Sequence, residues 1–156
     1  MFLLKAKEAL NQWDNIRQTL EESIPYHLRS PQFFIDQLRR NISEGTILCW
    51  RRNDGDKIAN IVVTTIIDDY LLLTRNLCIF AAKSFIPTTK EARIEMFDVL
   101  AKYGSTMGCR NIIAYSNDAK IAEYALEMSA KKQEVFCFNI SEYWTDKEDI
   151  DGTKSS

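Results

Sequence analysis

Residues 109–130 read CRNIIAYSNDAKIAEYALEMSA, and the spacing of the apolar residues changes in the middle of this stretch. Residues 109–116 form a short apolar and aromatic run, which is typical of a strand. Over residues 118–129 the apolar side chains, Tyr124 among them, recur at helical spacing. Asn117 stands at the junction, where its side chain can cap a helix. The stretch therefore predicts a strand that is followed at once by a helix.

Upstream of this stretch the sequence predicts a β-hairpin and a third strand. Two apolar runs, residues 46–52 and 57–67, flank Asn53-Asp54-Gly55-Asp56. Asp-Gly suits the positive φ angles of a tight turn, so the runs should pair as antiparallel strands. Residues 70–82 (YLLLTRNLCIFAA) continue the β-branched and aromatic pattern and predict another strand. The acidic pair Asp68-Asp69 should form a solvated turn before it, although two acids could also attract an amine substrate.

A crossover helix connects this third strand to the strand at 109–116. Thr88 has Glu91 three residues later, a capping-box pattern that predicts a helix over residues 88–107. A strand, helix and strand in one sheet form a right-handed parallel unit. The sheet should therefore be mixed, since its first hairpin is antiparallel.

The remaining segments complete the expected order of elements. Residues 5–23 have helical periodicity, and a second helix should run from Ser30 to Gly45. Residues 133–140 predict a last strand. The order is α-α-β-β-β-α-β-α-β, an α/β fold with a mixed sheet and helices on both of its faces. We expect one domain over residues 1–140, followed by an acidic tail at 141–156.

The composition excludes several classes of protein. The chain has 156 residues, 46% hydrophobic and 27% charged, with a net charge of −2 and no basic stripe, so we expect no nucleic-acid partner. No apolar run approaches the ~18 residues that span a bilayer, which predicts a soluble, cytoplasmic protein without a membrane partner. The four cysteines lie in separate apolar runs and His27 is the only histidine. We therefore expect buried thiols in a reducing compartment, and no metal site.

The element order, together with Asn117, Ile121, Ala122 and Tyr124, resembles the GNAT superfamily of N-acetyltransferases over residues 30–140. The resemblance implies an acetyl-CoA cofactor, with Asn117 contacting its pantetheine arm. Tyr124 would be the general acid that protonates the departing coenzyme A thiolate. The arm would lie along the backbone of residues 77–81, which contain the candidate cofactor-binding positions Leu77, Ile79 and Ala81.

One diagnostic element of the GNAT superfamily is missing from this sequence. Its members carry a Gly-rich turn, Q/R-x-x-G-x-G/A, whose backbone N–H groups hold the coenzyme's pyrophosphate at a helix N-terminus. The corresponding segment reads AAKSFIPTTKEARIEMF, and no glycine occurs between Gly55 and Gly104. The side chains of Lys83, Lys90 and Arg93 could replace part of the lost phosphate contacts.

The eroded glycine loop gives the chain a looser resemblance to GNAT-like proteins found inside tailed-phage particles. That resemblance implies a catalytically reduced protein that acts as an assembly or interaction component of a particle assembled in the cytoplasm. Its partner would be another protein or further copies of itself. The alternative is an acetyl-CoA-dependent N-acetyltransferase that acts on a small-molecule amine.

The individual residues also have structural interpretations. Tyr124 could be a core tyrosine and Asn117 only a helix cap. The candidate basic side chains could meet water alone, and His27 could be a surface residue. Tyr143 and Trp144 could anchor a partner or pack on their own domain.

Overall fold

The computed structural model describes residues 1–23, 32–114 and 119–132. The chain divides into two compact units, Met1–Asn117 and Asp118–Ser156, and each is described by itself. The predicted last strand at 133–140, the acidic tail, His27 and Asn117 all lie outside the described residues. The domain boundary at residue 140 remains a prediction.

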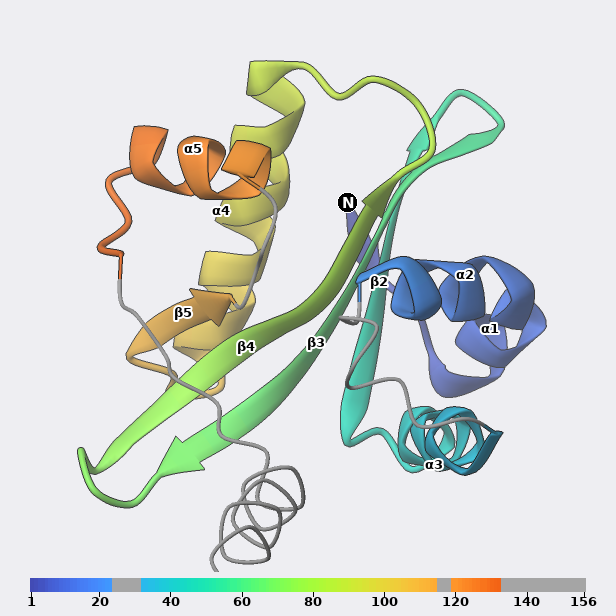
Figure 1. Cartoon of the computed structure of the whole chain (residues 1–156), viewed down its shortest axis with the longest axis horizontal. Coiled ribbons are helices and arrows are strands. Elements are labelled where there is room, and N and C mark those ends of the chain that lie inside the picture. Colours follow the sequence, from blue (N-terminus) through green and yellow to red (C-terminus); the bar gives the residue numbers. More distant parts are fainter. Residues whose placement is uncertain (24–31, 115–118, 133–156) are drawn as a thin grey trace, which may run out of the picture. The chain divides into compact units, whose positions relative to one another are not determined.

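Five strands form one sheet in the order β1-β2-β3-β4-β5. The pairs β1–β2, β2–β3 and β3–β4 are antiparallel. The pair β4–β5 is parallel, as the crossover helix between these strands requires. Helices α1 to α3 precede β2, and α4 connects β4 to β5 (Figure 1). The bounds are β1 Phe2–Leu3, α1 Ala6–Asn11, α2 Trp13–Ser23, α3 Gln32–Ser43, β2 Ile47–Asp54, β3 Lys57–Asp69, β4 Thr74–Ser84, α4 Lys90–Thr106, β5 Asn111–Ala114 and α5 Ala119–Glu127.

The N-terminal segment differs from the predicted single helix over residues 5–23. The helix is broken at Gln12, whose φ of −112° and ψ of 23° are not helical and whose N–H bonds to the carbonyl of Ala9. Two helices result, and the sequence pattern did not indicate the break. The short strand β1, which pairs with Trp50 and Arg51, was also not predicted.

The predicted hairpin is confirmed, with Gly55 at φ 57° in the turn between β2 and β3. The predicted start of the next strand at Tyr70 is wrong, because β3 continues to Asp69 and β4 begins only at Thr74. One carboxylate oxygen of Asp69 accepts hydrogen bonds from the backbone N–H groups of Leu71 and Leu72, both at 3.0 Å. These bonds hold the intervening residues in a turn in spite of their strand-like sequence.

Apolar side chains on both faces of the sheet are buried under helices. On one face, helices α1 to α3 pack over a cluster that includes Ile16, Leu20 and Ile61. On the other face, Leu100 of α4 packs with Trp50 and other residues of the sheet. Burial of the two clusters fixes which face of each strand can reach which helix layer.

We predict that Ile61→Ala lowers the free energy of unfolding by about 2–5 kcal/mol, because the Ile61 side chain is completely buried and its truncation leaves a cavity. Ile67→Ala is the matched control, on the same strand and the same face. Its side chain is 38% exposed, so we expect a loss below about 1 kcal/mol. Urea unfolding of both variants measures the difference, and equal losses would contradict the assignment of the core.

Candidate functional site

Strands β4 and β5 pair over only part of the length of β4. Asn76 to Ile79 of β4 lie opposite Asn111 to Ala114 of β5, whereas β4 continues to Ser84 beside β3. The candidate positions Leu77 and Ile79 contact the cluster under α4, and Leu77 is fully buried. The resemblance predicts that the cofactor arm lies along the backbone of this part of β4.

A β-bulge at Phe80 divides β4 into two parts. Thr64 of β3 lies opposite Ile79, but Val63 lies opposite Ala81, so Phe80 is an extra residue in β4. Beyond the bulge Ala81 contacts the cluster under α1 to α3 instead of the one under α4. The candidate positions Leu77 and Ile79 therefore contact one helix layer and Ala81 contacts the other.

Lys83 also lies on the α1–α3 side of the sheet. Its ammonium group forms an ion pair with Glu22 of α2 at 2.5 Å and lies 5.1 Å from the centre of the Phe85 ring. The lysine side chain is only 16% exposed. The hydrogen bond from Lys83 lowers the pKa of Glu22 from its ordinary value. Binding of a phosphate by Lys83 would therefore have to compete with Glu22.

The N-terminus of α4 is capped by side chains of its own first turn. Thr89, and not Thr88 as the sequence pattern suggested, is the N-cap, and its hydroxyl oxygen accepts a 3.2 Å bond from the N–H of Ala92. Interaction with its own backbone N–H, and next with the Thr89 side chain, lowers the pKa of the Glu91 carboxyl from its ordinary value. The negative charge that this helix end favours is thus already supplied.

Thr88 belongs to a polar cluster beneath the segment that connects β4 to α4. The side-chain amide of Asn60, which is 2% exposed, donates to the hydroxyls of Ser84 and Thr88 at 2.7 and 2.9 Å. Arg52 donates to the side-chain carbonyl of Asn60 at 3.3 Å, and Arg93 donates to the backbone carbonyl of Thr88 at 2.8 Å. These bonds tie the connecting segment to the sheet and to the first turn of α4.

The sequence reading did not single out Arg52 or Asn60. The signal that could have found them is the polar Asn60 within the apolar run of residues 57–67. A buried polar side chain in a strand requires hydrogen-bond partners, and here those partners come from the connecting segment.

Known structures identify the fold. A protein of Clostridium acetobutylicum described as a predicted acetyltransferase, solved with acetyl-CoA, superposes with a TM-score of 0.66 at 15% identity, covering 90% of this chain and 96% of that one. An aminoglycoside acetyltransferase from an uncultured soil metagenomic sample gives a TM-score of 0.63 at 14% identity, covering 89% and 95%. The protein AAC(6')-Iy, bound to the bisubstrate analogue CoA-S-monomethyl-acetylneamine, gives 0.62 at 12% identity, covering 83% and 90%.

The chain has the GNAT fold. No protein-family model and no curated protein matches the sequence. Since the identities with the solved structures are this low, the likeness establishes the fold alone. The GNAT architecture that the sequence predicted, a mixed sheet with helices on its faces, is therefore confirmed.

The residues that would carry GNAT chemistry are only partly described. Tyr124 lies on α5, as predicted, and its side chain is half-buried. It belongs to the second compact unit, Asp118–Ser156. Asn117 lies outside the described residues. The roles of Tyr124 and Asn117 therefore remain predictions.

The basic candidates lie in three different surroundings. Lys83 is paired with Glu22, Arg93 is bonded to the Thr88 carbonyl, and Lys90 is exposed at the first position of α4. Lys83 belongs to β4, whereas Lys90 and Arg93 belong to the first turn of α4. Their role in binding the cofactor remains a prediction.

Helix α5 ends at a serine in the left-handed conformation. Ser129 has a φ of 67°, and its N–H bonds to the carbonyl of Leu126. The N–H of Ala130 bonds to the carbonyl of Ala125, which completes a Schellman motif. A serine thus takes the left-handed conformation that usually falls to glycine.

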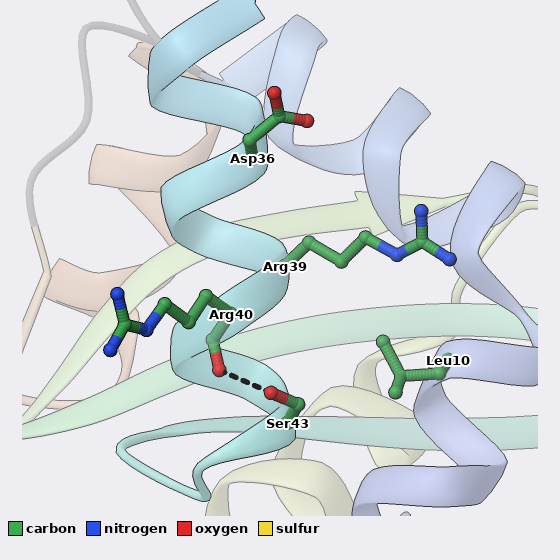
Figure 2. Close-up of a pocket in the computed structure, with 5 residues that line it drawn as sticks. All are labelled: Leu10, Asp36, Arg39, Arg40 and Ser43. Atoms are coloured by element: carbon green, nitrogen blue, oxygen red, sulfur yellow. Dashed lines mark hydrogen bonds between the residues drawn. The ribbon is translucent and has the colours of Figure 1, made fainter.

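A separate hollow of about 410 Å³ lies between α1 and α3 (Figure 2). Its lining residues are Leu10, Asp36, Arg39, Arg40 and Ser43. Arg39 lies over the ring of Trp13 at 5.6 Å, and Arg40 forms an ion pair with Glu44 at 2.8 Å. Both guanidinium groups therefore already have partners, and the hollow lies on the opposite face of the sheet from Leu77 and Ile79.

Within the described parts of the chain, no three His, Cys, Asp or Glu side chains are grouped so that they could hold a metal ion. Cys49 and Cys78 are free and buried as predicted, whereas Cys109 is only half-buried. Burial raises the pKa of Cys49 to about 12. No helix among the residues described has the length and apolarity needed to cross a membrane.

We predict that Lys83→Met raises the pKa of Glu22 back toward its ordinary value, because the mutation removes the hydrogen bond that favours the carboxylate. The ion pair contributes to the stability of the fold at pH values above the ordinary pKa of glutamate. This contribution is lost as the pH falls through the lowered pKa. NMR titration of the side-chain carboxyl carbon measures the change. Lys90→Met is the control and should leave Glu22 unaffected. An unchanged Glu22 titration in Lys83→Met would contradict the pairing.

Proposed function

We propose that this protein is a catalytically reduced member of the GNAT fold that acts as an assembly or interaction component, of the kind found in a phage particle. The occupied N-terminus of α4 carries this proposal. In a GNAT fold a pyrophosphate is expected at that helix end, where backbone N–H groups point outward. Here Thr89 caps the helix and Glu91 places a carboxylate in the first turn.

The polar cluster under the connecting segment supports the same proposal. A pyrophosphate would have to displace the Glu91 carboxylate and approach a backbone that contains no glycine. The segment is held in place by Asn60 through Thr88 and by Arg93 through the Thr88 carbonyl. Each charge-assisted hydrogen bond withheld from a ligand is worth about 1.5–3 kcal/mol. The loss of two would weaken cofactor binding by about a hundredfold to ten-thousandfold.

The second candidate is an acetyl-CoA-dependent N-acetyltransferase. Its support is the short pairing of β4 with β5 and the fold shared with a protein solved with acetyl-CoA and another solved with a bisubstrate analogue. In this case the amine of a small molecule would attack the thioester carbonyl. Tyr124 would then give its phenolic proton to the thiolate as the C–S bond breaks, and the proton lost by the amine nitrogen would restore the phenol, with Asn117 on the pantetheine arm. Lys83, Lys90 and Arg93 would supply the charge that the glycine loop supplies elsewhere.

Calorimetric titration of the full chain with coenzyme A and with acetyl-CoA distinguishes the two functions. We expect no measurable heat with up to about 1 mM ligand. Binding that is too weak to detect at this concentration has a free energy below about 4 kcal/mol. Glu91→Gln tests whether the Glu91 charge prevents coenzyme A from binding, since it removes the competing charge but preserves the shape of the side chain.

Micromolar binding by the unmodified chain would contradict the proposed function and favour the enzyme. Tyr124→Phe should then lower kcat with little change in KM, because the phenol acts only as the thiolate leaves. A loss of affinity instead would assign Tyr124 to cofactor binding.

A further inference from the structure

The connection between β3 and β4 presents four consecutive apolar residues to solvent. The exposed fractions are 84% for Tyr70, 96% for Leu71, 72% for Leu72 and 87% for Leu73. We call residues 70–73 the YLLL tip. A run of this kind is unfavourable in water and marks a contact surface when it occurs in a folded protein.

The YLLL tip is a structured turn. Asp69 accepts hydrogen bonds from the N–H groups of Leu71 and Leu72, and Leu73 adopts a φ of 50°. Just below the tip, Arg75 of β4 forms a 2.8 Å ion pair with Asp68 of β3. The apolar side chains are thus held outward by local bonds, which reduces the entropy lost when a partner covers them.

The YLLL tip also extends past the neighbouring strands. Strand β2 begins at Ile47 opposite Thr65, and β5 begins at Asn111 opposite Asn76. The last residues of the β3–β4 hairpin therefore form a two-stranded ribbon at the end of the sheet (Figure 1). A second molecule can reach the tip without displacing either flanking strand.

We propose that the YLLL tip is a self-association surface that packs against the YLLL tip of a second copy across a twofold axis. This inference rests on the proposed function and names the partner of that interaction. An apolar tip is complementary to itself, as an interface about a twofold axis requires. If every exposed side chain of both tips were covered, at on the order of 150 Å² for the tyrosine and somewhat less for each leucine, two tips would bury about 1,000 Å², which is a small interface.

The charges at the base of the YLLL tip agree with this partner. Each copy carries the carboxylates of Asp68 and Asp69 and the guanidinium of Arg75. The Arg75 guanidinium is paired with Asp68, and the Asp69 carboxylate accepts from Leu71 and Leu72, so these charges are satisfied within each copy and two tips can meet without leaving one of them unpaired. The same carboxylates, on a chain of net charge −2, would be repelled by an anionic membrane surface.

Sedimentation velocity of the full chain over a concentration series tests the proposal. Because the buried area is small, we expect a reversible dimer with a dissociation constant in the micromolar range. Leu71→Asp should weaken dimerisation at least tenfold, since a carboxylate would be buried in the apolar contact. Ile94→Asp is the control: Ile94 is 43% exposed on α4, and its replacement should leave the dimer unchanged. Circular dichroism confirms that both variants fold.

Cross-linking tests whether the two tips meet. In Leu72→Cys the new thiols of both copies lie close to the twofold axis, so a short bis-maleimide should join them. Ile94→Cys should give only the wild-type background from the native thiols. A chain that is monomeric at all concentrations, or a dimer that Leu71→Asp does not weaken, would overturn the proposal. So would a monomer that binds phosphatidylcholine vesicles through the tip.

The calorimetric titration separates this inference from the proposed function. A chain that binds coenzyme A and still dimerises through the YLLL tip contradicts the proposed function alone. A chain that binds no coenzyme A and stays monomeric contradicts this inference alone.

Discussion

Both faces of strand β3 are buried over residues 59–64, and the remaining elements of the sheet depend on this constraint. Ile61 and Val63 point into the cluster under α1 to α3, whereas Val62 points into the cluster under α4. The strand also pairs with β2 on one side and β4 on the other. A shift of one residue in this strand would exchange its two apolar sets and expose both helix layers.

The sequence predicted those features that depend on long apolar patterns and on glycine in a tight turn. The β2–β3 hairpin follows from Asp54-Gly55, and the crossover helix follows from the capping pattern of Thr88 and Glu91, although the N-cap is Thr89. The parallel pair β4 and β5 is then a consequence of right-handed crossovers. These are strong local signals, and the packing of the sheet supports them.

Features that depend on one extra residue or on one side-chain bond could not be predicted. Nothing in residues 74–84 announces the bulge at Phe80, because the strand has apolar residues on both faces of the sheet. The turn at Tyr70–Leu73 has the composition of a strand, and the carboxylate of Asp69 overrides it. For the candidate site, the sequence shows that the glycine loop is missing. It could not predict the pairing of Lys83 with Glu22, because these residues lie 61 positions apart.

The bulge at Phe80 gives the two ends of one strand different neighbours. Leu77 and Ile79 contact the layer of α4, whereas Ala81 and Lys83 contact the layer of α1 to α3. Sequence change in β4 should therefore be correlated in two separate blocks among related chains. Exchanges before the bulge should accompany exchanges in α4, and a charge change at position 83 should accompany one at position 22.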